Sequence, residues 1–217
     1  MIPRLVLFDC DGVLVDSEPI TNKIMQANFA KRGLDLDMDQ INATFVGGTM
    51  ATAGKQAAQM GANINDDWVD EIYAEIFAGL AKGTPLIKGI ENVLDQLDAA
   101  GIPYGVGSNG SFEKMEITLG QHPQIQQRLS GRIFSAHVHA KPKPAPDLYL
   151  FAAKAMGVDP RHCVVVDDSP SGCTAAVKAG IICHGFAEHD DGARLATVGA
   201  RVFHQMANLP RILGLPG

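Results

Sequence analysis

The chain has 217 residues, of which 46% are hydrophobic and 19% are charged, and its formal net charge is −6. This composition is typical of a folded protein with a sizeable core, and the length allows one domain, or one core with a modest insertion. The acidic balance and the lack of a Lys/Arg run exclude the basic face that nucleic-acid binding needs, so any site for an anionic ligand must carry its own local cation.

Nothing in the sequence predicts export or insertion into a membrane. The apolar run Leu5–Phe8 is too short for a signal peptide or a membrane span, and no later stretch is long enough to cross a bilayer. The four cysteines stand singly, without a C-x-x-C pair, which favours reduced thiols. We therefore expect a cytoplasmic protein with no membrane partner. No heptad pattern predicts an oligomer, which leaves the oligomeric state open and is compatible with a monomer.

The N-terminal part of the chain predicts one buried strand followed by a helical insertion. Leu5–Phe8 stops at acidic and glycine residues, as expected for a strand buried on both faces of a parallel sheet. Periodicity and end signals then predict helices at Glu18–Lys31, Met38–Phe45, Met50–Met60 and Asp66–Lys82. We therefore expect a small helical domain, residues 17–84, inserted into a Rossmann-like core of residues 1–16 and 85–217.

The remainder of the chain alternates between apolar runs and helical patterns. Strands are predicted at Pro103–Gly107, Arg132–Ser135, Cys163–Val166 and Ile181–Cys183. Helices are predicted where Ile90, Val93, Leu94 and Leu97 share one apolar face, and at Asp147–Met156 and Ser171–Lys178. Such alternation implies right-handed βαβ crossovers, so we expect an α/β fold with a doubly wound parallel sheet.

Polar side chains with related chemistry follow the predicted strands. In an open α/β sheet the ligand site lies outside the carboxyl ends of the strands. The residues at those ends are Asp9, Asp11, Ser108, Asn109, Lys141, Lys143, Asp167 and Asp168. Crowded carboxylates call for a hard divalent cation, and Mg²⁺ prefers carboxylate oxygens together with substrate phosphate. The hydroxyl and amide can bind phosphate oxygens, and a lysine can neutralise a phosphoryl group in the transition state.

The spacing of the first two aspartates suits phosphoryl transfer. Residues i and i+2 of an extended strand point to the same side, so Asp9 and Asp11 can approach one bound phosphate. One carboxylate can then attack phosphorus while the other handles the proton of the leaving group. Gly12 allows the chain to turn sharply away after the pair.

Four segments of the chain, in order, resemble the motifs of the haloacid dehalogenase superfamily. Asp9–Ser17 resembles the DxDGxxxDS/T motif, Ser108–Asn109 the second motif, Lys143–Asp147 the lysine motif and Val166–Gly172 the acidic motif. The resemblance covers nearly the whole chain. The helical insertion resembles the cap of the subgroup that contains beta-phosphoglucomutase-like proteins and sugar-phosphate phosphatases. Taken singly, each segment has a simpler interpretation, such as a surface pair or a helix N-cap, but four together favour the functional one.

The resemblance implies a role for each acidic residue. Asp9 would be the nucleophile that forms an aspartyl-phosphate, and Asp11 would protonate the leaving alcohol and then activate water. Asp9, the backbone carbonyl of Asp11 and Asp168 would hold Mg²⁺, while Asp167 would support these ligands without binding the metal.

The resemblance also implies a set of phosphate-binding residues. Ser108 and Asn109 would bind the phosphate, and Lys143 would bridge the phosphate and the nucleophile. Lys141 is the alternative lysine, and we choose Lys143 because it directly precedes the Pro-Ala-Pro-Asp segment, as in the family.

These features predict a Mg²⁺-dependent phosphatase for a small phosphate monoester, with a sugar phosphate or a phosphorylated sugar acid as the expected substrate. Phosphoglycolate is an alternative. A phosphosugar mutase is disfavoured, because Thr21 replaces the histidine of the mutases and Gly47–Met50 lacks their arginine. Asp11 argues against a dehalogenase, which would need no acid at that position. A phospho-aspartate receiver domain, the non-enzyme alternative, would be shorter and would lack the insertion.

Some residues with metal-binding potential are given a simpler interpretation. His137 and His139 alternate on a possible strand but lack a third ligand, so we expect them to be solvated or hydrogen-bonded. Glu188–Asp191 is expected to be a surface loop. Trp68 and Phe77 are expected in the core of the insertion rather than in a substrate platform.

Overall fold

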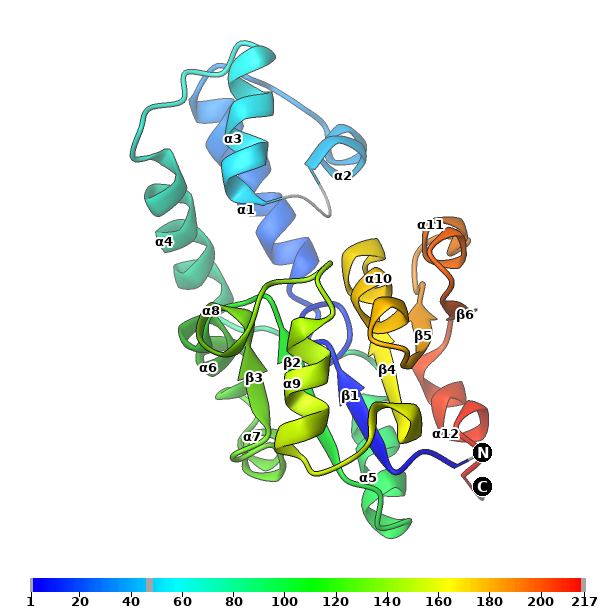
Figure 1. Cartoon of the computed structure of the whole chain (residues 1–217). Helices are drawn as coiled ribbons and strands as arrows, with labels where there is room; N and C mark the ends of the chain where they lie inside the picture. The colour runs from blue at the N-terminus through cyan, green and yellow to red at the C-terminus, as the bar shows by residue number, and fades with distance from the viewer. Residues whose placement is uncertain (1, 46–48, 216–217) are drawn as a thin grey trace. The chain divides into compact units, whose positions relative to one another are not determined.

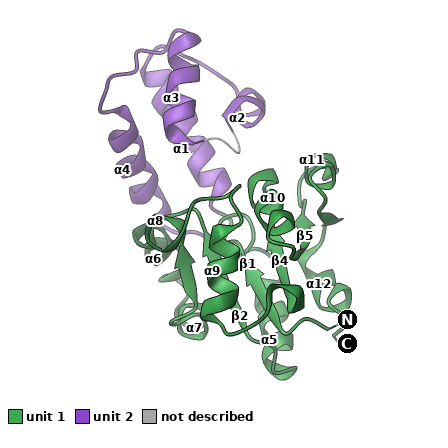
Figure 2. Cartoon of the chain, in the orientation of Figure 1, with its two compact units in different colours: residues 1–16, 85–217 green, residues 17–84 purple. Residues whose placement is uncertain are grey.

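The computed structural model describes residues 2–45 and 49–215. The chain forms two compact units, residues 1–16 with 85–217 and residues 17–84 (Figure 2). We refer to them as the core unit and the inserted unit. None of the helices in the described part of the chain has the length and apolar character to cross a membrane.

The core unit is built on one six-stranded, fully parallel sheet with the order β3-β2-β1-β4-β5-β6 (Figure 1). The strands are β1 (Leu5–Phe8), β2 (Tyr104–Ser108), β3 (Ile133–Ser135), β4 (Cys163–Asp167), β5 (Ile182–Phe186) and β6 (Arg201–Phe203). β1 lies in the middle, with Phe8 in register with Val106 of β2 and Val166 of β4. The carboxyl ends of these three strands therefore meet at one edge of the sheet.

Helices cover both faces of the sheet, which explains why its strands are apolar throughout. Val6 and Phe8 pack in one cluster with α5 (Ile90–Ala99) and α6 (Phe112–Leu119). Leu5 and Leu7 pack in the other cluster with α9 (Asp147–Ala155) and α10 (Pro170–Lys178). The remaining helical segments of this unit are α7 (Pro123–Arg128), α8 (Ala136–His139), η1 (Pro160–His162), α11 (Ala193–Thr197), η2 (Met206–Asn208) and α12 (Leu209–Ile212). The doubly wound parallel fold predicted from the sequence is confirmed.

The strands of the core unit differ from the prediction in three main respects. β6 was missed because its short segment is partly exposed and carries no apolar run. β5 continues to Phe186, beyond the predicted end at Cys183, through pairing with β6. The possible strand through His137 and His139 is wrong: this segment is the short helix α8. Its start is fixed locally, because the Ser135 side chain accepts a hydrogen bond from the His137 backbone N–H (3.2 Å).

The inserted unit consists of four helices, α1 (Glu18–Lys31), α2 (Met38–Phe45), α3 (Met50–Gln59) and α4 (Trp68–Leu80). The indole of Trp68 stacks on Phe29 with ring centroids 5.5 Å apart, and Phe45 lies 4.9 Å from Phe29 on a second side. The indole N–H donates to Asn28 Oδ1 (2.8 Å), so the buried ring has its one polar group satisfied. In the segment Gly47–Met50, where the mutase arginine would align, Gly47 and Gly48 lie outside the described residues.

The chain leaves and re-enters the core unit through neighbouring backbone segments. Val15 pairs with Leu86 in an antiparallel bridge, and the Asp16 N–H donates to the Pro85 carbonyl (2.8 Å). Val15 also forms a bridge with Asp11. The connections to the inserted unit therefore begin directly beside the end of β1.

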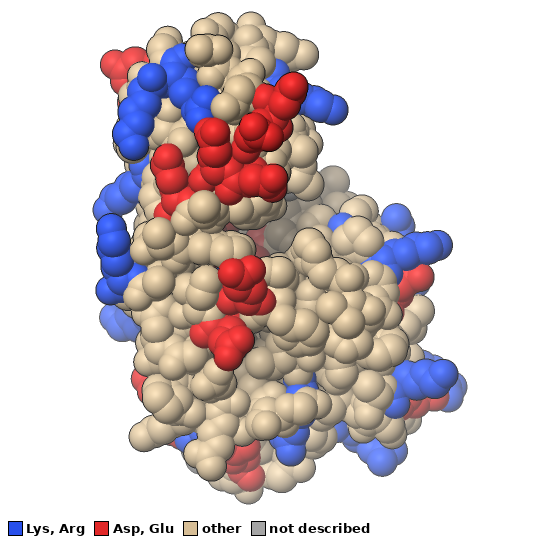
Figure 3. All heavy atoms as spheres, turned by 90° about the vertical axis from the view of Figure 1, so that its left-hand side faces the viewer, with Lys and Arg blue, Asp and Glu red and all other residues tan. Residues whose placement is uncertain are grey.

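In Figure 3, basic side chains lie mainly along the edges of the view. On this face acidic side chains gather over the inserted unit, and much of the core unit is uncharged. This distribution agrees with the net charge of −6.

Candidate active site

The candidate site is assembled from the carboxyl ends of β1, β2 and β4. Asp9 follows the last residue of β1, Ser108 is the last residue of β2 and Asp167 the last of β4. The Asp9 N–H donates to the Val166 carbonyl (2.9 Å), which fixes the start of the loop after β1 against β4. Parallel pairing thus gathers three polar residues that are far apart in the sequence.

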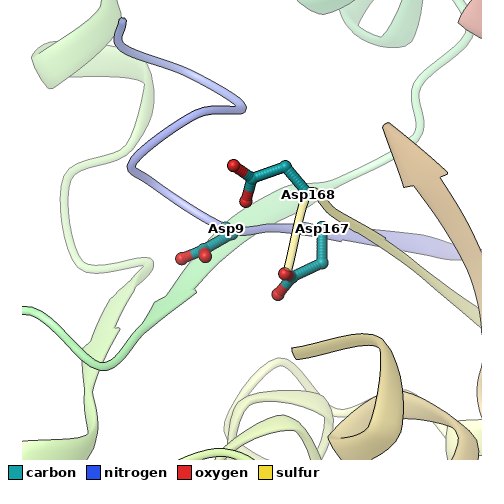
Figure 4. A group of neighbouring side chains, drawn as sticks. All are labelled: Asp9, Asp167 and Asp168. Carbon is teal, nitrogen blue, oxygen red and sulfur yellow. The ribbon is translucent and has the colours of Figure 1, made fainter. Parts of the chain in front are cut away.

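Three carboxylates form a cluster at this edge of the sheet (Figure 4). Asp9, Asp167 and Asp168 each offer an oxygen, and these oxygens all lie within 4.8 Å of one another. The side chains of Asp167 and Asp168 extend to opposite sides of the end of β4 (Figure 4). Gly12, with a φ of 72°, allows a close approach, because a Cβ there would stand 1.9 Å from Asp168 Oδ2. The donor set is that of a hard divalent cation.

Asp167 is a fully buried acceptor whose two oxygens already receive hydrogen bonds. Oδ2 accepts from Lys143 Nζ (2.8 Å) and from the Tyr149 hydroxyl (2.6 Å). Oδ1 accepts from the Ser169 backbone N–H (2.9 Å) and from its hydroxyl (2.7 Å). The absence of a side chain at Gly172 makes room, since a Cβ there would lie 1.8 Å from Asp167 Oδ2. This carboxylate is therefore placed to hold Lys143.

Lys143 bridges two of the carboxylates. Its Nζ lies 2.8 Å from Asp167 and 3.1 Å from Asp9 Oδ1, and its side chain is only 2% exposed. Burial lowers the pKa of this ammonium group, but the adjacent carboxylates of Asp167 and Asp9 raise it by more, so the net pKa is raised and the group stays charged. Lys141, the alternative considered from the sequence, lies exposed on the preceding loop.

Asp9 is in an environment that opposes its negative charge. Burial raises the pKa of Asp9 to about 7, with further upward contributions from Asp167 and Asp11. Lys143 and the Cys10 backbone N–H, which donates to Asp9 Oδ1 at 2.7 Å, act in the opposite direction. A further cation beside this carboxylate would therefore favour the ionised, nucleophilic form.

The Asn109 side chain holds the lysine-bearing loop. Its Oδ1 accepts from the Lys143 backbone N–H (2.8 Å) and its Nδ2 donates to the Lys143 carbonyl (3.2 Å). The amide thus joins the loops after β2 and β3 at the residue that carries the ammonium group. The nearby Ser108 is buried, and its Oγ accepts from the Gly110 N–H (2.9 Å), which leaves its own O–H able to donate.

Asp11 is paired with a lysine that sequence reasoning missed. Lys114 Nζ lies 2.9 Å from Asp11 Oδ2. Burial lowers the pKa of Lys114, but Asp11 raises it by more, so the ammonium group stays charged. No local pattern marks Lys114, because its partner Asp11 lies far away in the sequence, near the N-terminus. The Asp11 side chain is not part of the three-carboxylate cluster.

Two other residues of the site were also missed. Tyr149 looks like an ordinary core residue of an amphipathic helix, and only the fold brings its hydroxyl to Asp167. Ser169 carries a recognisable signal, because a serine before a helix that starts with proline is a typical N-cap, and its Oγ accepts from the Gly172 N–H (3.0 Å). The same hydroxyl donates to Asp167.

Comparison with known proteins gives consistent matches over most of the chain. The profile of the haloacid dehalogenase-like hydrolases matches residues 3–180. The 6-phosphogluconate phosphatase of Escherichia coli (strain K12) is 28% identical over 208 residues, which cover 95% of this chain and 93% of that protein. Hexitol phosphatase A of the same organism is 32% identical, with 82% and 79% covered.

Among solved structures, a family hydrolase from Deinococcus radiodurans R1, determined with bound phosphate and sodium, superposes with a TM-score of 0.84. It is 34% identical to this chain, and the match covers 97% of this chain and 95% of the other.

Proposed function

The chain belongs to the haloacid dehalogenase-like hydrolases and is a phosphoric monoester hydrolase, and we propose that it is a Mg²⁺-dependent phosphatase that works through a phosphorylated Asp9. The observation that carries this proposal is the buried Lys143, held between Asp9 and Asp167 beside the carboxylate Asp168. This arrangement supports the proposal because it combines a buried cation with carboxylate oxygens that could hold a metal ion.

Asp9 is the nucleophile in this proposal. The hydrogen bonds from Lys143 and from the Cys10 N–H both fall on Oδ1, so we assign Oδ2 to attack on phosphorus. A bond forms between Oδ2 and phosphorus as the bond to the alcohol oxygen breaks, and the Lys143 charge stabilises the phosphoryl oxygens.

Asp11 is the acid and base of the same proposal. In its protonated form it gives its proton to the departing alcohol oxygen, and the resulting carboxylate then takes a proton from the water that attacks phosphorus. The second attack breaks the bond between Asp9 and phosphorus, releases inorganic phosphate and regenerates both aspartates. Ser108 donates its hydroxyl to a phosphate oxygen, while Asn109 contributes its backbone N–H and holds Lys143 in place.

The residues present fit a magnesium ion. Asp9, Asp168 and the Asp11 carbonyl would hold it, with Asp167 committed to Lys143, Tyr149 and Ser169. The described site contains four carboxyl groups, Asp9, Asp11, Asp167 and Asp168, against two lysines, Lys114 and Lys143, so the acidic groups outnumber the basic ones by two. When bound, Mg²⁺ would offset that excess and the charge on the phosphate.

We propose a sugar phosphate or a phosphorylated sugar acid as the substrate. The phosphatases named above act, by their names, on 6-phosphogluconate and on hexitol phosphates, which supports this class. We further propose residues 17–84 as the cap domain that selects the substrate and residues 1–16 with 85–217 as the catalytic core. Thr21, at the position of the mutase histidine, favours transfer to water over transfer to a second sugar.

A screen of the purified protein against phosphate monoesters tests the proposal. Continuous release of phosphate that stops with a chelator and returns with Mg²⁺ is the expected result. Accumulation of one stoichiometric phosphate on the chain, without continuous release, would instead indicate a receiver-like protein. Phosphoglycolate is the comparison substrate, and equal or better kcat/KM for it than for every sugar phosphate would refute the substrate class. Acid-quenched protein should carry a labile phosphoryl group that the Asp9→Asn variant lacks.

A further inference from the structure

Lys114 is a largely buried cation in the site to which the proposed reaction assigns no role. Its side chain is 21% exposed and that of Asp11 is 25% exposed, with 2.9 Å between Nζ and Oδ2. Burying a lysine costs free energy unless the charge is compensated, and Asp11 provides that compensation here.

The position of Lys114 is unfavourable for the helix that carries it. It lies in the first turn of α6, where the helix dipole repels a positive charge. Ser111 already caps the N-terminus of this helix, because its Oγ accepts a hydrogen bond from the Lys114 backbone N–H (3.2 Å). Helix stability therefore gives no reason for a lysine at this position, and its contact with Asp11 does.

The ion pair of Lys114 and Asp11 lies close to the Ser108 hydroxyl, which the proposed function assigns to phosphate binding, and Gly110 lies beside all three. A Cβ built on Gly110 would lie 3.2 Å from Ser108 Oγ, 3.7 Å from Asp11 Oδ2 and 3.8 Å from Lys114 Cδ. The loop itself is fixed, because the buried Ser135 hydroxyl donates to the Gly110 carbonyl (2.6 Å). The segment that carries Ser108 and leads to Lys114 is therefore held in place beside Asp11.

We propose that Lys114 is a positioning residue, whose contact with Asp11 Oδ2 holds the Asp11 carboxyl group, protonated or ionised, in the orientation needed to meet the leaving-group oxygen. This inference rests on the proposed function, in which Asp11 is the acid and base. Proton transfer depends steeply on distance and alignment, so an Asp11 side chain that lacks this contact would lose much of its effect on a poor leaving group. An ester whose leaving group departs without a proton would be affected little.

The test compares kcat/KM for an alkyl phosphate and for p-nitrophenyl phosphate, because kcat/KM reports the steps up to departure of the alcohol. Lys114→Met should lower the value for the alkyl ester by about 30-fold and that for the aryl ester by less than about 3-fold. Lys114→Arg should recover most of the alkyl-ester activity. Lys154→Met, which removes an exposed lysine of α9, is the matched control and should change neither value. The ratio of kcat/KM for the alkyl ester to kcat/KM for the aryl ester, measured on one preparation, does not depend on the fraction of folded protein. Lys114→Gln provides a second variant with an uncharged side chain.

Equal losses for the two esters in the neutral variants would overturn the proposal and would indicate that Lys114 binds the phosphate. In the Asp11→Asn background, Lys114→Met should add no further selective loss, and additive losses would also contradict the inference. If Asp11→Asn itself shows no difference between the esters, the role of Asp11 in the proposed function fails instead. The two failures are therefore distinguishable.

Discussion

Among the described residues, the core unit buries titratable side chains as well as uncharged polar ones, whereas the inserted unit buries only uncharged polar ones. Among the described residues, the buried lysine, aspartate and histidine side chains, Lys143, Asp167 and His184, all belong to the core unit. The buried polar residues of the inserted unit are uncharged, namely Ser17, Asn22, Asn28 and Thr84. An uncharged group needs only a hydrogen-bond partner, whereas a buried charge needs an opposite charge as well.

The comparison shows that the unfavourable burial of charged groups is found in the core unit. In the inserted unit, the Asn28 side-chain oxygen accepts the hydrogen bond of the Trp68 indole N–H, and the ring itself stacks on Phe29. In the core unit, burial, with a smaller contribution from neighbouring carboxylates, raises the pKa of Asp9 to about 7, which disfavours its charged form. Such an arrangement does not serve stability and is expected where the charge is used in a reaction.

The largest effect should come from Asp9→Asn, which removes the proposed nucleophile and changes little in size. We expect kcat to fall by about ten-thousand-fold or more, with the fold retained because Lys143 keeps its bond to Asp167. Phosphate release and circular dichroism measure the two effects. Asp39→Asn, at an exposed position of the inserted unit, is the matched control and should keep full activity. An active Asp9→Asn enzyme would remove Asp9 from the mechanism.

Lys143→Met should be the most destabilising change, because it leaves Asp167 buried without its cation. We expect the free energy of unfolding to fall by about 3 kcal/mol, together with loss of activity. Chemical denaturation measures the change. Lys141→Met is the control two positions away, and its exposed side chain should make it nearly neutral. Equal effects of the two substitutions would show that the buried bridge is not the source of stability.

Asn28→Ala tests the inserted unit by leaving the Trp68 N–H without its acceptor. The expected loss is about 2 kcal/mol of unfolding free energy, and phosphate release should be affected less than by any change at the site. Trp68 is the single tryptophan of the chain, so its fluorescence reports the unfolding of this unit. Asn65→Ala, exposed in the same unit, should stay within about 0.5 kcal/mol of the parent. A neutral Asn28→Ala would mean that another acceptor replaces the lost one.

The smallest effect should be a pH dependence of the core unit through His184. Burial lowers its pKa from 6.5 to about 4, and the charge of Arg201 adds to this. Between these values the unfolded chain binds a proton that the folded chain does not, so stability falls as the pH drops from about 6.5 towards 4. His184→Gln should reduce this loss by about 1 kcal/mol. Chemical denaturation at several pH values measures this loss of stability. The His189 side chain is 78% exposed, so His189→Gln should leave the pH dependence of the unfolding free energy unchanged.

Local sequence patterns were sufficient for much of the fold. The runs at Leu5–Phe8 and Cys163–Val166 gave strands with nearly the observed bounds, because a strand buried on both faces must be apolar throughout. β6 carries no such run, since it lies at the edge of the sheet. The possible strand at His137 failed because the alternation of two histidines was outweighed by a helix cap at Ser135.

By itself, the sequence determined the family, the parallel α/β core and the acidic and lysine residues that follow its strands, because these depend on short motifs and local periodicity. Only the tertiary structure decided which groups pair. It placed Lys143, and not Lys141, between Asp9 and Asp167, and it joined Lys114 to Asp11. Hydrogen bonds and ion pairs form across space between loops that parallel strands bring together, so no local pattern in the chain encodes them.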